Sequence, residues 1–349
     1  MRLKKKWRLI FFTASASVFI IYLMSLTAGF INPGICYIFA FTGLGFPIVY
    51  GIHFLNTVFN LKNRKWFWIL LFFLVLGSPI MLRHYSLPLK ANRNNGEYSL
   101  ISYNVEGFYM PRAADAPIKR NQVLSDLLIQ SPDLMFFQEF HFGKIKSDDP
   151  VYKQYPHYFP KEHSNTNVIF STYPLTHGGK LSSDGEVFAV YADAAFPEQT
   201  IRLINVHLRS IMLTNERELL QPSVDETIQR STVRKLLRTF RKLRSAFKHR
   251  AIEIKALNAL IVDSPFPVLL AGDFNDTPAS YAYRQINRQL NDASFLRGKG
   301  WRRTYLESTF PLKIDHIFAA PQIDSRYYER LTLDYSDHYP VGISFDLSE

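Results

Sequence analysis

The sequence predicts an α/β domain in which helices cover the sheets, preceded by a membrane anchor with three transmembrane helices. Charge is the first observation behind this prediction. The first 96 of the 349 residues contain eleven Lys or Arg and no Asp or Glu, whereas the rest of the chain contains thirty residues of each sign and is formally neutral. The second observation is that short apolar runs of β type alternate with helical patterns after residue 97, which is typical of layered α/β folds.

The N-terminal segment is apolar enough to cross a membrane. No charged residue occurs from Leu9 to Leu61, and a single turn signal, Asn32-Pro33-Gly34, interrupts this stretch. Since roughly 20 apolar residues span a bilayer, we predict three spans. They cover residues 9–30, 35–59 and 66–82. A buried helical bundle of a soluble protein is the alternative, and the lack of any acidic residue over this length argues against it.

The distribution of basic residues predicts the orientation of the anchor. Five basic residues precede the first span, none lies between the first and second spans, and three lie between the second and third. Because Lys and Arg accumulate on the cytoplasmic side, we expect a multi-pass protein of the cell (inner) membrane with an extracytoplasmic C-terminal domain. Cleavage of 1–30 as a signal peptide is the alternative, and it leaves the domain on the same side.

The domain organisation follows from these boundaries. Residues 1–86 form the predicted anchor, the polar segment 87–96 a linker, and residues 97–349 one further domain. Its predicted strands are 98–104, 134–138, 168–171, 188–193, 201–207, 268–273, 314–318 and 341–345. Helical periodicity predicts helices over 118–130 and 225–263.

Polar residues follow the apolar runs at six places. They are Asn104, Gln138-Glu139, His207, Gly272-Asp273-Phe274-Asn275, Asp315-His316 and Ser336-Asp337-His338. Each alone is weak, because Asn commonly forms turns and a single His is commonly structural. Together they provide the carboxylate, amide and imidazole groups of a hard-cation site with acid–base function. The single cysteine, Cys36, excludes a disulfide framework and a cysteine zinc site.

In this order, the six segments resemble the endonuclease/exonuclease/phosphatase superfamily, whose fold is DNase I-like. The likeness covers about 97–349, and Phe170-Ser171-Thr172-Tyr173-Pro174 is similar to a further segment of that superfamily. The N-terminal spans make the chain similar to membrane-anchored bacterial members. The resemblance implies a four-layer α/β/β/α sandwich and hydrolysis of phosphate esters by in-line attack of water, assisted by Mg²⁺ or Mn²⁺.

The resemblance also implies the ligands of the metal ion. Glu139 would be the principal carboxylate ligand, with Asn104 beside it and Asp337 completing the shell or bridging through water. Mg²⁺ needs few protein ligands, since it keeps several waters and binds substrate phosphate.

The remaining roles concern protons and developing charge. Asp315 would orient His338 as the general base, and Asp273 is the rival base. Asn275 would donate to a nonbridging oxygen, and His207 would stabilise the developing charge or protonate the leaving group. The sequence leaves the choice between Asp273 and His338 open.

Three functions compete at this level. The first is a membrane-anchored phosphoesterase acting on a lipid headgroup or another extracytoplasmic phosphate ester. The second is an extracytoplasmic nuclease acting on DNA or RNA, and the third is a catalytically silent binding module on the same fold. The anchor and the neutral domain favour the first slightly, and the intact polar segments argue against the third. No protein partner is predicted.

Residues 230–250 form a basic segment within the longest predicted helix. They contain nine Lys or Arg and no acidic residue, and apolar residues recur at three- and four-residue spacing. A solvated surface helix is the plainest interpretation. Contact with anionic lipid headgroups and contact with a nucleic-acid backbone are the alternatives.

Overall fold

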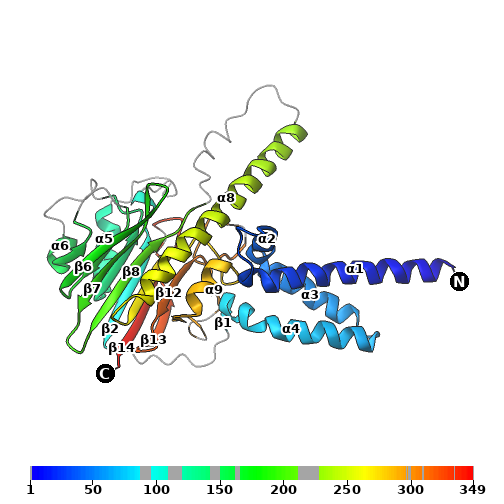
Figure 1. Cartoon of the computed structure of the whole chain (residues 1–349), viewed down its shortest axis with the longest axis horizontal. Helices are drawn as coiled ribbons and strands as arrows, with labels where there is room; N and C mark the ends of the chain where they lie inside the picture. Colours follow the sequence, from blue (N-terminus) through cyan, green and yellow to red (C-terminus); the bar gives the residue numbers. More distant parts are fainter. Residues whose placement is uncertain are drawn as a thin grey trace.

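The computed structural model describes residues 2–86, 96–108, 120–141, 150–161, 166–210, 228–295, 297, 300–308, 310–333 and 335–348. A stem of N-terminal helices projects from one side of an α/β body (Figure 1). The predicted linker 87–96 lies outside the described residues except for Gly96.

The stem consists of helices α1 (Arg2–Thr27), α2 (Ile38–Leu44), α3 (Phe46–Phe59) and α4 (Arg64–His84), with the short 3-10 helix η1 (Ala28–Phe30) after α1. Two helical segments, Lys6–Phe30 and Arg64–His84, are long and apolar enough to cross a membrane, and there are three spans if α2 and α3 count as one.

The second span differs from the single helix predicted over 35–59. Helices α2 and α3 meet at an angle of 79°. The break falls at Gly45, and Pro47 lies in the first turn of α3. Proline has no amide hydrogen and its ring collides with the preceding turn, so a straight helix cannot run through this point.

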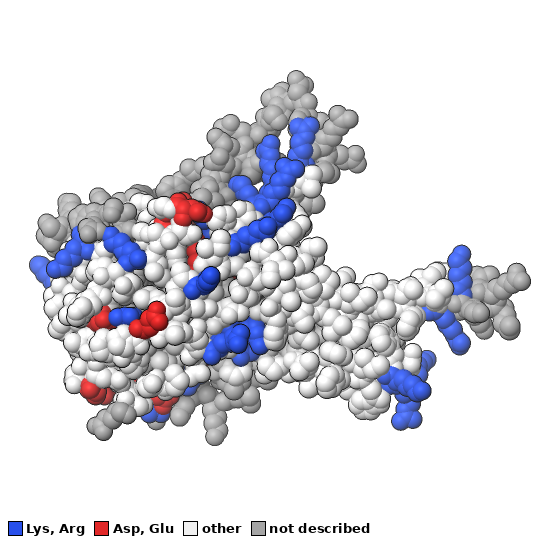
Figure 2. Space-filling view, in the orientation of Figure 1, with Lys and Arg blue, Asp and Glu red and all other residues white. Residues whose placement is uncertain are grey.

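Charge is arranged along the stem as the sequence predicts. Lys6, Lys62, Arg64 and Lys65 are exposed at the end of the stem farthest from the body, and Figure 2 shows an uncharged band between that end and the body. Basic residues also border this band on the body side, so the orientation stays a prediction.

The stem is joined firmly to the body before the linker begins. Helix α4 continues directly into strand β1 (Tyr85–Ser86), which pairs with β11 (Gly300–Trp301). The backbone N–H of Arg302 donates to the carbonyl of His84, and its guanidinium donates to the Ser86 hydroxyl at 2.8 Å. Up to Ser86, therefore, the anchor is part of the packed structure and not a tether.

The body contains two six-stranded sheets. One has the order β13-β14-β2-β3-β5-β4, and the other β10-β12-β9-β8-β7-β6. In the first sheet the strands are β2 (Tyr98–Asn104), β3 (Leu134–Gln138), β4 (His157–Phe159), β5 (Val168–Ser171), β13 (Ile323–Arg330) and β14 (Val341–Leu347). In the second they are β6 (Leu175–Ser183), β7 (Glu186–Ala195), β8 (Thr200–His207), β9 (Val268–Asp273), β10 (Asn291–Asp292) and β12 (Asp315–Ala319).

Three buried clusters define four layers. Alternate residues of the central strands, such as Leu100 and Leu203, form the core between the sheets. Helices α5 (Arg120–Ile129) and α6 (Pro150–Gln154) cover the outer face of the first sheet, and α8 (Ile228–Val262) and α9 (Tyr281–Asn287) cover that of the second. The predicted four-layer α/β/β/α sandwich is thus confirmed.

The predicted strands and those observed differ mainly at the sheet edges. β2, β3, β5 and β9 have the predicted bounds, and β3, β5 and β9 contain the apolar runs expected of strands buried on both faces. β6 and β13 are not among the predicted strands. Both are edge strands, and β6 has no buried residue and no apolar run.

A buried polar bridge joins the two sheets. The Gln138 amide donates to the Asn205 side-chain oxygen at 2.6 Å, and both side chains are fully buried. The Asn205 amide in turn donates to the backbone carbonyls of Phe137 and Val168, at 2.8 and 2.9 Å. Three hydrogen bonds from one side chain of β8 therefore hold it to β3 and β5 of the opposite sheet.

We expect Asn205→Ala to lower the free energy of unfolding by about 2–4 kcal/mol, because it removes a hydrogen-bond partner from each of three buried groups, the Gln138 amide and the carbonyls of Phe137 and Val168. The measurement is denaturant unfolding of the detergent-solubilised full chain, followed by circular dichroism. Asn291→Ala is the control, since Asn291 is an exposed strand residue of the same sheet, and its change should stay within about 0.5 kcal/mol. Equal effects of the two substitutions would contradict the bridge.

Candidate active site

The site lies where two pairs of parallel strands end. β2 and β3 pair in parallel with Asn104 opposite Gln138, and β8 and β9 pair in parallel with His207 opposite Asp273. Because parallel strands end at the same edge, each pair delivers its polar residues together. The two sheets face each other, so the two sets of residues meet.

Local backbone conformation explains the Gly-Asp-Phe-Asn motif. Gly272 has a φ of 142°, and a Cβ atom there would lie 2.0 Å from the carbonyl oxygen of Val206 on the adjacent strand. Asn275 adopts a left-handed conformation with a φ of 51°, and its N–H donates to the Asp273 carboxylate at 2.7 Å. Glu139, which follows β3, is also left-handed, with a φ of 54°. Such conformations are disfavoured for residues other than glycine and cluster at functional sites.

Asp273 lies at the centre of the site. Its Oδ2 atom accepts hydrogen bonds from the side-chain amides of Asn104 and Asn275, each at 3.1 Å. The Nε2 atoms of His207 and His338 both lie 3.7 Å from the same oxygen. Burial raises the pKa of the Asp273 carboxyl, opposed by His338 and reinforced by the Asp315 carboxylate.

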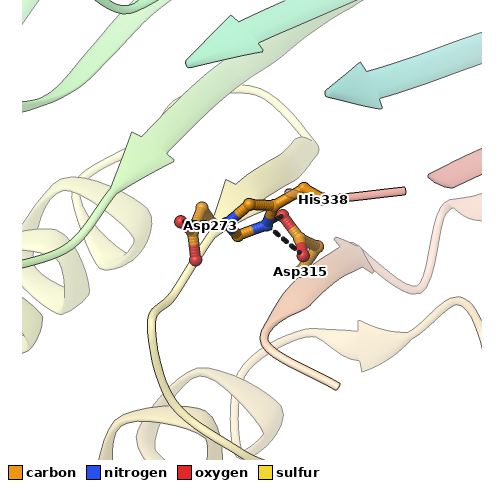
Figure 3. Close-up of side chains that lie close together, drawn as sticks. All are labelled: Asp273, Asp315 and His338. Atoms are coloured by element: carbon orange, nitrogen blue, oxygen red, sulfur yellow. Dashed lines mark hydrogen bonds and ion pairs between the residues drawn. The ribbon is translucent and has the colours of Figure 1, made fainter. Parts of the chain in front are cut away.

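Asp315 and His338 form a buried pair (Figure 3). The Nδ1–H of His338 donates to the Asp315 carboxylate, with N–O distances of 2.9 and 3.1 Å. Antiparallel pairing of β12 with β9 sets Asp315 opposite Asp273, so His338 lies between two carboxylates. Burial disfavours the imidazolium, but Asp315, Asp273 and Asp337 outweigh this effect and raise the pKa of His338 to about 10.

A group of carboxylates borders this pair. Burial raises the pKa of Asp337, and the charges of Glu139 and Glu307 add to the effect against that of His338. Burial likewise raises the pKa of Glu106 to about 7, and the charge of Asp337 adds to the rise. The Asn104 side-chain nitrogen donates to Glu139 Oε1 at 3.1 Å, and its side-chain oxygen accepts the N–H of Glu106. Mutual repulsion of this kind is relieved when a cation binds among the carboxylates.

The donor set tests which metal ion fits. Asp273, Asp315 and His338 offer three ligand atoms within 4.8 Å of one another. In this group, however, Nδ1 of His338 is already hydrogen-bonded to Asp315, and its Nε2 lies 3.7 Å from Asp273 Oδ2, so the three side chains form a charged pair with a neighbouring carboxylate. Carboxylate and amide oxygens of Glu139, Asp337 and Asn104 are the hard ligands that Mg²⁺ or Mn²⁺ prefers. Nε2 of His207 is buried without a hydrogen-bond partner, 3.6 Å from Glu139 Oε1.

The structure brings all eight predicted site residues together. Contacts of 3.8 Å or less connect them in one network: Asn104, Glu139, His207, Asp273, Asn275, Asp315, Asp337 and His338. Their roles stay predictions.

Sequence reasoning missed two carboxylates of the site, Glu106 and Glu307. Glu106 follows Asn104 by two residues, which is a usable signal, whereas Glu307 has no motif around it. It also left Gln138 and Asn205 without a role, and the structure assigns both to the bridge between the sheets.

Comparisons with known proteins agree with this geometry. Residues 101–338 match the Endonuclease/Exonuclease/phosphatase family, and the chain belongs to this family. Its members are phosphoester hydrolases, most of them dependent on a metal ion. Residues 8–84 match a domain of unknown function, DUF8431. No curated protein sequence matches the chain.

Solved structures of low sequence identity resemble the body. A humanized D. rerio TDP2 has a TM-score of 0.50 at 18% identity, with 71% of this chain and 98% of that chain covered, and it supports the DNase I-like fold. The human Nocturnin catalytic domain has a TM-score of 0.49 at 15% identity, covering 72% and 94%. Beta toxin from Staphylococcus aureus has a TM-score of 0.46 at 17% identity, covering 72% and 100%.

The Asp315–His338 pair predicts a dependence of stability on pH. A histidine whose folded pKa is raised to about 10 contributes stability that is complete below its ordinary pKa of about 6.5 and is lost as the pH rises through 10. We therefore expect chelator-treated wild type to have a higher free energy of unfolding than chelator-treated Asp315→Asn. The difference between the two proteins should be largest at pH 6 and should shrink steadily towards pH 10.

Denaturant midpoints of both proteins across this range measure the effect. Groups that titrate alike in both proteins, such as Lys313, cancel in the difference. Asp324→Asn is the control, because it removes a partly exposed aspartate that pairs with Arg326. The difference in unfolding free energy between wild type and this variant should not change over this pH range. A constant difference for Asp315→Asn would mean that His338 is not held in its charged form.

Proposed function

We propose that this protein is a membrane-anchored, divalent-metal-dependent phosphoesterase that hydrolyses a phosphodiester or phosphomonoester by in-line attack of water. One observation carries the proposal. Two sets of residues meet where the parallel strand pairs end: Glu139, Asn104 and Asp337 form one set, and Asp273 with the Asp315–His338 pair forms the other. This arrangement combines oxygen ligands for a hard cation with groups that hold a proton. Membership of the family supports the reaction class.

Glu139, Asn104 and Asp337 would hold Mg²⁺ (or Mn²⁺). When bound, the ion would polarise the phosphoryl oxygen and neutralise the leaving oxygen. Burial, and to a smaller extent the charges of neighbouring carboxylates, raise the pKa values of Asp337 and Glu106, and a bound cation would offset both effects, which supports this ligand set.

Asp273 is the group that would accept the proton of the attacking water. His338 already carries a proton at neutral pH because Asp315 stabilises its charged form, so it suits the stabilisation of phosphoryl charge better than the role of base. Burial raises the affinity of Asp273 for a proton, which favours it as the acceptor. His207 and Asn275, both directed at Asp273, would stabilise a nonbridging or leaving oxygen.

The substrate we favour is a lipid headgroup or another extracytoplasmic phosphate ester. Residues 97–349 are formally neutral, whereas a protein that grips a long duplex carries a basic excess on its binding domain. The direct connection of α4 to the body through β1 also keeps the domain beside the membrane. A nuclease is the second candidate, and the basic residues of α8 are the observation in its favour.

Activity of the full chain towards a panel of phosphate esters tests the proposal. The panel contains an aryl phosphodiester, an aryl phosphomonoester, phospholipids, plasmid DNA and RNA, each with and without Mg²⁺. Glu139→Gln should lose about a hundredfold or more and recover partly with excess Mn²⁺, because it keeps the shape of the ligand and removes its charge. Asp273→Asn should lose about 10²–10⁴-fold with no recovery by Mn²⁺, because the loss is of a proton acceptor.

Glu97→Gln is the matched control, since Glu97 is an exposed carboxylate at the opposite end of β2, and it should keep full activity. Full activity of chelator-treated Glu139→Gln would overturn the metal assignment. Absence of turnover for every ester would favour a silent binding module.

The orientation of the anchor has its own test. We expect a reporter that is active only outside the cytoplasm to be active when fused after Glu349, and inactive when inserted in the loop 60–65. The reason is the excess of basic residues at the N-terminus and in that loop, at the end of the stem away from the body. The reverse pattern would put the body in the cytoplasm.

A further inference from the structure

Helix α8 carries a strongly basic surface that the site does not use. We call residues 234–250 the basic half of α8. From 228 to 252 the chain contains nine Lys or Arg and no acidic residue. Figure 1 shows this half rising away from the body on the side where α2 lies, and Figure 2 shows Lys and Arg along it.

Aromatic contacts fix the basic half of α8 against the anchor. The ring of Phe41, from α2, stacks on Phe240 with a centroid distance of 4.1 Å and an interplanar angle of 3°. Phe41 also meets Phe247 edge-on at 5.2 Å, and the guanidinium of Arg244 lies over Tyr37 at 4.5 Å. Tyr37 and Phe41 precede the bend at Gly45, so the basic half packs against the part of the stem that lies next to the body.

The exposed residues have the composition of an interfacial helix. Leu237 and Phe240 are 49% and 43% exposed, and Arg238, Arg241 and Arg244 between and beside them are exposed as well. Large apolar residues interspersed with Arg suit a boundary where apolar atoms enter the headgroup layer and cations meet lipid phosphates. A helix serving only as a solvated cover does not require exposed Leu and Phe at this place.

The same helix continues to the candidate active site. Arg250 is buried, with Nε 3.2 Å from Asp276 Oδ2, and its Nη1 donates to the carbonyl of Arg209. Glu253 accepts the N–H of Arg209. Asp276 follows Asn275 by one residue, and Arg209 follows His207 by two residues, so α8 supports the backbone of the site. Along the helix, Arg250 lies about 24 Å from Arg234.

We propose that the basic half of α8 binds the anionic lipid headgroups of the bilayer in which the protein is anchored. Continuity with the anchor and charge complementarity point to this partner and away from a nucleic acid. The contact fixes the orientation of the body over the membrane and holds α8 on the lipid surface. It goes beyond the proposed function and requires no turnover.

Hydrogen–deuterium exchange of the full chain in lipid nanodiscs tests the proposal. One set of discs contains phosphatidylcholine alone, and the other equal parts of phosphatidylcholine and phosphatidylglycerol. We expect amides of residues 237–248 to exchange about threefold or more slowly in the anionic discs, and this protection to disappear in about 0.5 M NaCl, because salt screens charges at the surface.

Paired variants separate the charge from the fold. Arg238→Gln combined with Arg241→Gln should abolish the lipid-dependent protection and leave exchange in β9 unchanged. Lys255→Gln, on an exposed part of α8 outside the basic half, should behave as wild type. Equal protection in both discs, or protection that survives the double substitution, overturns the proposal. Protection by a DNA duplex in the neutral discs, stronger than that by anionic lipid, overturns it in favour of nucleic acid.

Discussion

The hydrogen bond between Gln138 and Asn205 fixes the geometry on which the site depends. Each residue lies in one of the two parallel strand pairs, just before the polar residues that follow the strands, so this bond sets how the pairs face each other. Glu139 follows Gln138 directly, and His207 follows Asn205 by two residues. A shift of either sheet would break three buried hydrogen bonds and separate Glu139 from His207 at the same time.

The charges of the site are poorly balanced by the chain alone. Asp273, Asp337 and Glu106 all have raised pKa values, with burial as the largest cause, and His338 is held in its charged form. Glu139 and Asn275 adopt left-handed backbone conformations at the same edge. Such features lower stability, and they persist because the surrounding sheets fix the backbone. Buried carboxylates and strained backbone of this kind agree with the proposed binding of a cation and a phosphate ester, because both ligands would interact with these groups.

Several contacts pack the stem against the body, and two of them lead towards the site. At the first, the guanidinium of Arg302 bonds Ser86 of β1 and also the hydroxyl of Ser294, which accepts a bond from the buried Lys313 at 2.6 Å. Lys313 precedes Asp315 by two residues, so this contact leads from the end of α4 to the site. At the second, Phe41 packs on α8, whose opposite half supports the loops after β8 and β9. Both routes connect the apolar stem to the polar edge of the body.

The sequence by itself predicted layered α/β structure, the apolar N-terminal segment and the polar residues that the fold brings together, and its resemblance to a known family implied the four layers. Strands such as β3 and β9 are recognisable because burial of both faces gives them apolar runs. Gly272-Asp273-Phe274-Asn275 is recognisable as an Asp and an Asn two residues apart after such a run, and the structure shows that its glycine is needed for the close approach of Val206. Only the tertiary structure decided the break at Gly45, the edge strands β6 and β13, the carboxylates Glu106 and Glu307, and the charged state of His338. The reason is physical: apolar patterning records whether a residue is buried, whereas hydrogen bonds and charge interactions depend on distances between segments that lie far apart in the chain.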